Sequence, residues 1–194
     1  MNLIERVKNI LIAPQKEWAV IRKENDSPVK VLTSYLILLA LIPTAAAFVG
    51  WGFVGYKVYA VRVASVELGI RYGAIQFVSV ITGAYLTAFV LDLLAPNYGA
   101  EKGFDRAFQL SAYCYTAFCV AGVFYLLPSL STLASLAALY SLYLLYAGLK
   151  PMMKVPDEKA GKYFIAALLC MIAVSVVLSL VLGAAIGLRG ITHF

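Results

Sequence analysis

Asp92 is the only carboxylate inside any of the long apolar runs of this sequence, and it lies near the end of one, shortly before Pro96. An acid at membrane depth is a candidate for ion or proton transfer, because an unpaired charge in hydrocarbon is costly. A cation on the following segment, Lys102 or Arg106, could instead pair with it and fix the connection between two helices. The residues leave both interpretations open: a relay, or a structural ion pair at the membrane edge.

Uncharged polar side chains offer a second candidate site. Gln76 and Gln109 lie within apolar runs, together with several serines and threonines. Such groups usually form hydrogen bonds between helices, each worth about 0.6 kcal/mol on average. Gln76 and Gln109 could alternatively line a polar path together with Asp92. The sequence favours the packing role, because it does not show that their faces converge.

The remaining reactive residue types are too scattered for catalysis or metal binding. His193 is the single histidine, and the three cysteines, Cys114, Cys119 and Cys170, show no Cys-x-x-Cys spacing. Intramembrane hydrolysis needs a nucleophile with a base, paired acids, or metal ligands near one another. We therefore expect no enzyme activity, no metal site and no cofactor.

The composition indicates a protein whose main solvent is lipid. The 194 residues are 62% hydrophobic and 13% charged, whereas a soluble domain has roughly 45–50% apolar and about 25% charged residues. The net charge of +6 comes from basic residues at the edges of apolar runs. Anionic lipid headgroups fit that placement better than nucleic acid, which we do not expect as a partner.

The stretches long enough to cross a bilayer define the elements that must position these residues. A crossing helix needs about 20 apolar residues. Five stretches qualify and predict an all-α integral membrane bundle: 31–53, 70–94, 108–127, 130–149 and 163–188. Residues 1–30 form a separate N-terminal segment, and residues 31–194 a single transmembrane domain.

The distribution of basic residues predicts the orientation of these spans. With five spans and a cytoplasmic N-terminus, four of the sixteen Lys and Arg residues lie outside: Lys57, Arg62, Arg71 and Arg189. Cytoplasmic loops carry the excess of Lys and Arg in membrane proteins. This rule favours two separate spans on either side of Pro128, because merging them would export the lysines at 150–162. The C-terminus is then expected on the opposite side.

The first helix is predicted to be amphipathic. Its apolar face consists of Leu3, Ile4, Val7, Ile10 and Leu11, and its polar face of Glu5, Arg6, Lys8 and Asn9. It is too short to span, and a second short helix can start at Pro14 and carry Trp18 as an interfacial anchor. Two placements use the same apolar face: flat in the headgroup plane, or packed as a cap on the bundle.

Small residues at helical spacing allow close approach of two backbones. Gly69-x-x-x-Gly73 and Gly183-x-x-x-Gly187 have this spacing. They are expected either to close the bundle internally or to form a face for a homo-oligomer.

Four passages resemble the Yip-domain family, whose name refers to membrane proteins that interact with Ypt/Rab GTPases, and in particular its short bacterial branch. They are Asn9-Ile10-Leu11-Ile12-Ala13-Pro14 followed by Trp18, Gly103-Phe104-Asp105-Arg106-Ala107-Phe108, Leu139-Tyr140-Ser141-Leu142-Tyr143-Leu144-Leu145-Tyr146-Ala147-Gly148-Leu149, and Val155-Pro156-Asp157-Glu158-Lys159-Ala160. The resemblance covers nearly the whole chain and implies a five-span fold in the inner (plasma) membrane.

The resemblance does not extend to GTPase recognition. Eukaryotic family members carry a longer cytoplasmic N-terminal region and an Asp-Leu-Tyr-Gly-Pro motif before their first span. Here that region has about 30 residues and the motif is missing. Rab binding is therefore not expected, and a shared fold alone does not transfer an activity.

Two functions follow from the sequence. The first is a non-enzymatic membrane scaffold or adaptor that organises partner proteins or bilayer shape through its N-terminal helix and cytoplasmic loops. The alternative is a small oligomeric transporter or channel with Asp92, Gln76 and Gln109 near a polar path. The expected partners are the lipid bilayer, unidentified membrane proteins and a second copy of the chain.

Overall fold

The computed structural model describes the backbone of residues 2–58 and 61–190, and the side chains of residues 2–55, 63–134, 136–137, 139–174 and 176. The N-terminal half contains α1 (Leu3–Ile12), α2 (Pro14–Glu24), α3 (Pro28–Val31), η1 (Leu32–Leu36), α4 (Ile37–Val49), η2 (Gly50–Val54), β1 (Tyr56–Val58), β2 (Val61–Val63) and α5 (Val66–Leu94). The C-terminal half contains η3 (Ala95–Tyr98), α6 (Phe104–Ala121), η4 (Gly122–Leu126), η5 (Pro128–Leu130), α7 (Ser131–Met153) and α8 (Asp157–Gly190).

Four stretches of the described chain are long and apolar enough to cross a bilayer. They are Pro28–Val54, Val66–Tyr98, Phe104–Leu126 and Pro128–Met153, which agree with the first four predicted spans to within a few residues. The fifth predicted span, 163–188, lies in α8 and is helical, but the side chains of all its residues beyond 176 lie outside the described part of the structure. The chain is thus a multi-pass helical membrane protein with at least these four candidate spans.

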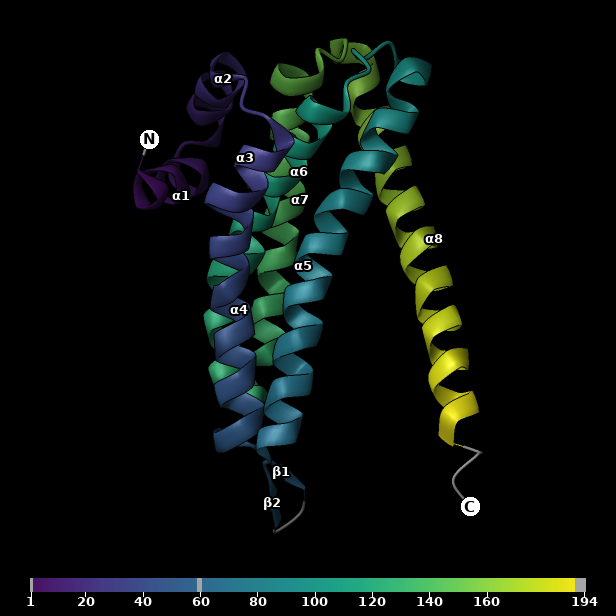
Figure 1. Ribbon diagram of the computed structural model, residues 1–194. Coiled ribbons are helices and arrows are strands. Elements are labelled where there is room, and N and C mark those ends of the chain that lie inside the picture. The colour runs from purple at the N-terminus through teal and green to yellow at the C-terminus, as the bar shows by residue number, and fades with distance from the viewer. Residues whose placement is uncertain (1, 59–60, 191–194) are drawn as a thin grey trace.

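The long helices run side by side and leave α8 at the edge of the bundle. Figure 1 shows α4, α5, α6 and α7 as one column, with α8 meeting α5 at one end and diverging from it toward the other. A short antiparallel hairpin, in which Lys57 lies opposite Arg62, joins the first two spans. Residues 54–69, which lie between the first two predicted spans, therefore contain both a short pair of strands and the beginning of α5.

The α6 helix occupies the centre of the bundle. Within its span 67% of the residues are buried in protein, whereas the other three candidate spans bury between 31% and 39%. Ser111 donates a hydrogen bond of 2.7 Å to the Ala84 carbonyl of α5, and both residues are fully buried. The outer helices instead expose large apolar side chains such as Leu38, Phe89 and Leu139. In a bilayer those side chains contact acyl chains, so an apolar exterior carries no hydrophobic cost.

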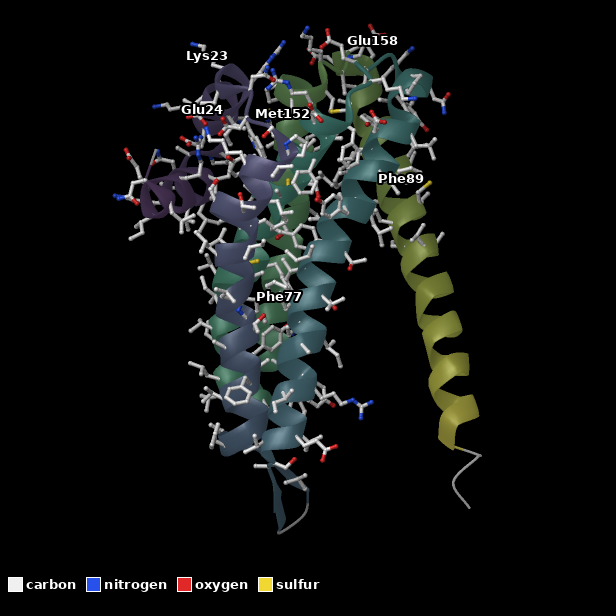
Figure 2. The ribbon with its side chains drawn as sticks, in the orientation of Figure 1. Lys23, Glu24, Phe77, Phe89, Met152 and Glu158 are labelled. Atoms are coloured by element: carbon white, nitrogen blue, oxygen red, sulfur yellow. The ribbon has the colours of Figure 1, made fainter. Side chains whose placement is uncertain are left out.

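Charged side chains gather at one end of the molecule, which we call the polar end. Figure 2 shows Lys23, Glu24 and Glu158 there, whereas Phe77 lies along the shaft of the bundle. The connections between spans are tied together at this end: the Glu101 N–H donates to the Met153 carbonyl at 2.9 Å, and Lys154 forms an ion pair with Glu101.

A second ion pair joins the ends of α7 and α8. Lys150 Nζ lies 2.8 Å from Asp157 Oδ1. This ammonium holds the pKa of the Asp157 carboxyl below its ordinary value. Both side chains are well exposed, so the pair contributes little to stability.

The first glycine pair closes the bundle internally. A Cβ at Gly69 would lie 2.6 Å from the Phe48 carbonyl oxygen, and one at Gly73 would lie 3.2 Å from the Thr44 oxygen. The absent side chains therefore let α4 and α5 approach closely. Of the two predicted uses of this pair, the structure shows internal packing; Gly183 and Gly187 lie outside the described side chains.

Replacing Gly69 by alanine tests this close approach. The added methyl would meet Phe48 and Gly52 backbone atoms, so α4 and α5 must separate, and we expect a loss of about 1–3 kcal/mol in the free energy of unfolding. Gly161→Ala is the matched control, because no atom lies within 4 Å of its added Cβ. That variant should be neutral or gain up to about 1 kcal/mol. Equal unfolding curves in detergent for the two variants would contradict the packing role.

Candidate functional site

The N-terminal helices dock on the polar end of the bundle. On α2 the buried residues are Pro14, Glu17, Trp18 and Ile21, which recur at the spacing of one helix face. On α1 they are Arg6 and Ile10, while Leu3, Val7 and Leu11 pack partly buried against the same core. This is the packed placement of the two that the sequence left open.

The outer side of α1 remains exposed. Ile4 and Ile12 are 75% and 73% exposed, so they point away from the bundle core. The six predicted anchor residues are Leu3, Ile4, Val7, Ile10, Leu11 and Trp18. Of these, only Ile4 is largely exposed, and Ile10 and Trp18 have no exposed surface. A lipid contact of α1 would therefore run through Ile4 and Ile12.

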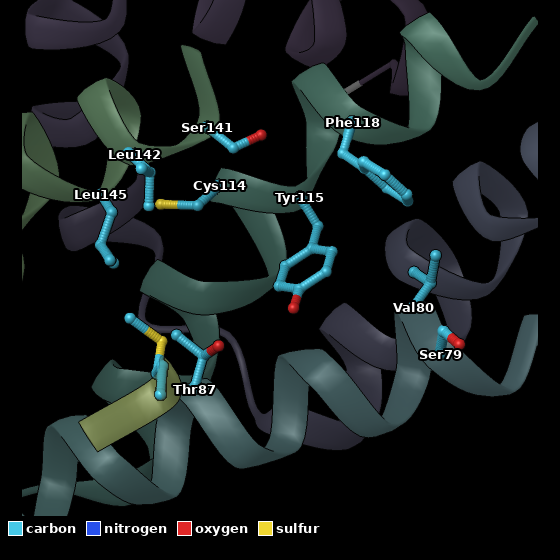
Figure 3. A pocket seen from close by; sticks show the side chains of 10 residues that line it. Ser79, Val80, Thr87, Cys114, Tyr115, Phe118, Ser141, Leu142 and Leu145 are labelled. Atoms are coloured by element: carbon cyan, nitrogen blue, oxygen red, sulfur yellow. The ribbon is translucent and has the colours of Figure 1, made fainter. Parts of the chain in front are cut away.

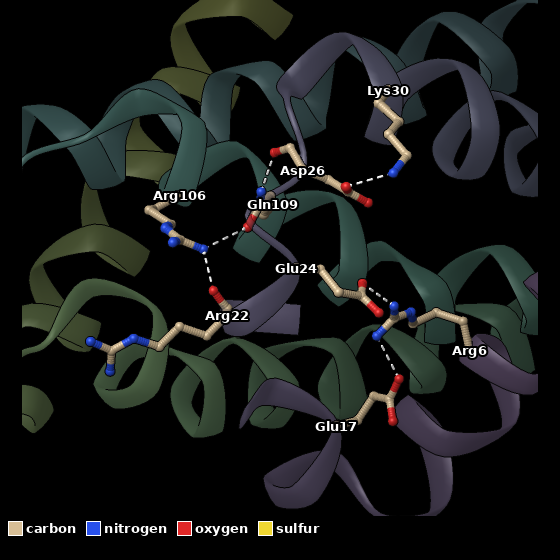
Figure 4. Close-up of polar contacts among 8 residues, drawn as sticks. All are labelled: Arg6, Glu17, Arg22, Glu24, Asp26, Lys30, Arg106 and Gln109. Atoms are coloured by element: carbon tan, nitrogen blue, oxygen red, sulfur yellow. Dashed lines mark hydrogen bonds and ion pairs between the residues drawn. The ribbon is translucent and has the colours of Figure 1, made fainter. Parts of the chain in front are cut away.

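Arg6 lies at the centre of a buried charge network, shown in Figure 4. Its Nη1 lies 2.6 Å from Glu17 Oε1, its Nη2 bonds Glu24, and its guanidinium carbon stands 5.5 Å from the centre of the Tyr113 ring. Arg6 and Glu17 are each 4% exposed. The prediction that Arg6 belongs to the solvated face of α1 was wrong: it lies four residues before Ile10, on the face that packs.

Trp18 is an internal side chain and not an anchor in the headgroup region. A Cβ on Gly148 of α7 would lie 2.7 Å from the Trp18 ring, so only a glycine leaves room for the indole there. The edge of Trp18 also meets Tyr113, with ring centroids 6.3 Å apart. The indole Nε1–H has no acceptor among the described residues. Packing against two helices must offset the cost of that unpaired donor, about 1–3 kcal/mol.

Side chains of α6 hold the end of α2 and the linker that follows it. Arg106 Nη1 donates to the Arg22 carbonyl at 2.9 Å and to Gln109 Oε1 at 3.3 Å. Gln109 in turn donates from Nε2 to the Asp26 carbonyl (Figure 4). Gln109 is thus a buried structural contact, in agreement with the packing role.

Among the described side chains, none that is cationic pairs with Asp92. Its Oδ1 accepts a hydrogen bond of 2.8 Å from the backbone N–H of Gly103, the residue before α6. Lys102 is exposed and Arg106 faces α2, so no ion pair with Asp92 occurs among the described interactions. The predicted ion pair is therefore replaced by a contact at a helix N-terminus, where an anion is favoured by the helix dipole.

Gln76 does not join these groups. Ser111 contacts Ala84 in the antiparallel pair α5–α6, so Gln109 lies near the level of residue 86 on α5. Ten residues of helix separate that level from Gln76, which is about 15 Å along the axis. The predicted polar path of Asp92, Gln76 and Gln109 is thus not assembled as a single site.

A mostly apolar cavity of about 340 Å³ lies between α5, α6, α7 and α8, and Figure 3 shows side chains that line it. Its lining includes Thr87, Cys114, Tyr115 and Ser141 among apolar side chains. No charged residue lines it, which suits an apolar or neutral guest better than an ion.

A second cavity, of about 390 Å³, lies at the polar end, and we call it the polar-end cavity. It is lined by Leu3, Arg6, Glu24, Asp26, Lys30, Ser34, Tyr35 and Tyr113. The rings of Tyr35 and Tyr113 lie 4.6 Å apart, and the Tyr35 hydroxyl shares a hydrogen bond of 2.7 Å with Thr116 Oγ1. Charged and aromatic groups from α1, α2, the linker that follows it, the start of the first span and α6 surround this common space.

Sequence reasoning missed Arg6, Glu17, Glu24 and Tyr113 as members of one site. The sequence did contain a signal, in the positions of these charges along each helix. Arg6 precedes Ile10 by four residues, and Glu17 adjoins Trp18 in the apolar stripe of α2. An opposite pair of charges, one in each stripe, predicts a buried ion pair. Within the described part of the chain, no three His, Cys, Asp or Glu side chains gather to hold a metal ion; His193 lies outside it.

Removing Arg6 should destabilise the docked N-terminus. Arg6→Ala leaves the Glu17 carboxylate buried without a cation, and such a loss typically costs about 3–5 kcal/mol. Lys8→Ala, on the exposed side of the same helix, should change the free energy of unfolding by no more than about 0.5 kcal/mol. The double variant Arg6→Met with Glu17→Met should recover most of the loss, because it removes both buried charges. Fluorescence-detected unfolding in detergent measures all three; identical curves for Arg6→Ala and Lys8→Ala would contradict the network.

Comparison with known proteins adds a family to this geometry. The sequence model described as the Yip1 domain matches residues 8–181. This range begins inside α1 and extends into α8, so it includes the second half of α1 and all of α2 as well as most of the bundle. No curated protein and no solved structure gives a match.

Proposed function

Since this chain belongs to the Yip1 domain family, we propose that it is a non-enzymatic membrane scaffold or adaptor that presents a rigid platform at its polar end. The observation that carries the proposal is the network of Arg6, Glu17 and Glu24, which joins α1 to α2 while Arg6 also stands over the Tyr113 ring of α6. A locked pair of helices offers partners a preformed surface, and binding to it costs less ordering entropy than binding to a mobile tail.

The outward side of α2 is the part of this platform most suited to partner proteins. Lys16 and Lys23 lie seven residues apart on its exposed face, with Val20 half exposed between them. Basic groups around an apolar centre favour a partner with acidic side chains around an apolar contact.

A charge reversal on α2 tests the adaptor proposal. In cells, crosslinking of the full chain should recover a defined membrane protein, and Lys16→Glu with Lys23→Glu should reduce that yield at least fivefold. The matched control is Lys102→Glu with Lys162→Glu, two exposed lysines elsewhere at the polar end. Both variants should unfold like the parent protein. A partner retained equally by both variants would contradict the role of α2.

We further propose that the chain crosses the membrane five times, with a cytoplasmic N-terminus and an external C-terminus. The fifth crossing is α8, whose residues 163–188 are apolar in sequence and helical in structure. With this orientation the polar end, which carries most of the basic residues, faces the cytoplasm, as the positive-inside rule favours. The inner (plasma) membrane is the proposed location.

Reporter fusions test the number of crossings. Alkaline phosphatase fused after Phe194 should be active, and a fluorescent protein at the same place should remain dark. The same reporters in the connection at residues 154–156 should give the reverse result. A bright fluorescent fusion at the C-terminus would contradict an odd number of crossings.

A small oligomeric transporter is the alternative, and the cavity of about 340 Å³ between the spans favours it. That cavity has hydroxyl groups but no charged lining residue, so it fits transport of a neutral solute better than ion conduction. Asp92 lies outside its lining. Uptake of neutral solutes by vesicles containing the purified protein would favour the alternative; proton flux abolished by Asp92→Asn would revive the relay.

A further inference from the structure

The polar-end cavity lies where the first span enters the bilayer. Lys30 and Ser34, on one wall, fall within the candidate span that begins at Pro28, and Leu3 of α1 lies on another wall. The adjacent α1 exposes Ile4 and Ile12. Charged groups, a hydroxyl and exposed apolar side chains at one level are typical of the headgroup region, so lipid headgroups are the molecules nearest to this cavity.

The lining charges are balanced, and the carboxylates retain capacity for a further donor. Two cations, Arg6 and Lys30, face two anions, Glu24 and Asp26. Asp26 accepts from Lys30 at 2.6 Å through Oδ1, and Glu24 accepts from Arg6 through Oε2. Among the described interactions, the second oxygen of each carboxylate accepts no hydrogen bond. An ionised carboxylate has about four acceptor positions, so each can accept another N–H.

The cations are not equally available. Arg6 is 4% exposed and already bonded to Glu17 and Glu24, so its charge is neutralised by protein. Lys30 has a side chain that is 63% exposed and makes one ion pair. A phosphate can therefore reach the Lys30 ammonium at the rim, whereas the interior of the cavity presents the carboxylate acceptors.

Two tyrosine rings, each 4% exposed, line the cavity beside these charges. Tyr35 and Tyr113 form a tilted pair with centroids 4.6 Å apart, and the Tyr113 ring already stands under the Arg6 guanidinium. A ring quadrupole attracts an ammonium group within about 6 Å of the centroid, and carboxylates beside the rings strengthen that attraction.

We propose that the polar-end cavity binds the headgroup of a zwitterionic aminophospholipid, with its primary ammonium at Asp26 and Glu24, beside the two tyrosine rings, and its phosphate at Lys30. The volume of about 390 Å³ lies within the range of small-ligand sites, about 300–1,000 Å³. Phosphatidylethanolamine has this chemistry. A lipid with phosphate but no ammonium supplies no further donor to the second oxygen of either carboxylate, and a quaternary ammonium cannot donate the hydrogen bonds. The proposal rests on the polar end lying in the headgroup region and does not require the adaptor role of α2.

Native mass spectrometry of the full chain tests this preference. Protein is equilibrated with phosphatidylethanolamine, phosphatidylcholine or phosphatidylglycerol of identical acyl chains. We expect tighter retention of phosphatidylethanolamine by about tenfold over either competitor. Equal or tighter retention of phosphatidylglycerol or phosphatidylcholine would overturn the proposal.

The variant that isolates the site is Asp26→Asn. It removes one carboxylate but keeps the backbone carbonyl that accepts from Gln109, so the linker should stay in place. It should reduce the preference for phosphatidylethanolamine at least fivefold, whereas the control Glu158→Gln, an exposed acid on α8, should leave it unchanged. An unchanged preference in Asp26→Asn would overturn the assignment.

Two further measurements separate the possible causes of a negative result. Free O-phosphoethanolamine at millimolar concentration should not displace the lipid; complete displacement would show that the ligand is soluble and would overturn the membrane source. Asp26→Asn should also leave the crosslinked partner of α2 unaffected. Loss of lipid preference with partner binding intact therefore separates this site from the adaptor proposal.

Discussion

Arg6 ties the N-terminal helices to the bundle through contacts with two elements at once. Its guanidinium meets Glu17 and Glu24 of α2 and the Tyr113 ring of α6. A buried cation is tolerated only when its partners are all in place, because the desolvation of an ion costs several kcal/mol. The position of α2 over α1, the linker at residues 25–27 and the start of the first span thus depend on one another.

The central helix α6 also holds the N-terminal segment in place. Arg106 and Gln109 hold the end of α2 and the linker, and Ser111 bonds α5 from the same helix. Polar groups at membrane depth must find partners within the protein, since hydrocarbon offers none. A helix that is buried on most of its surface can carry many such groups, whereas the outer helices cannot. The polar side chains of α6 therefore serve mainly to connect elements, and the family assignment covers all the elements that they connect.

The two cavities differ in chemistry according to their depth. The one between the spans is lined by hydroxyls, a thiol and apolar side chains, and none of its lining residues is charged. The polar-end cavity has charges of both signs beside two tyrosines. Among the described residues, charged side chains thus line the cavity at the polar end and not the one between the spans.

The sequence by itself determined the membrane class, the first four spans and the presence of two short N-terminal helices. Hydropathy over about 20 residues and the spacing of apolar side chains are local properties, so no distant partner is needed to interpret them. The family resemblance was likewise carried by local strings, and the Yip1 domain match confirmed it. The glycine pair at 69 and 73 predicted a close approach, although its partner helix was not evident.

Only the tertiary structure decided which polar residues meet. Gln109 bonds a carbonyl 83 residues away, and Trp18 fills a space that exists because residue 148 is a glycine. Asp92 was predicted to need a cation, but the fold supplies a backbone N–H from the start of α6 instead. The sequence placed Arg6 on the polar face of its helix. Its partners on α2 and α6 became evident only in the structure. The partner of a polar side chain is set by how helices pack, and packing depends on contacts between segments far apart in the chain.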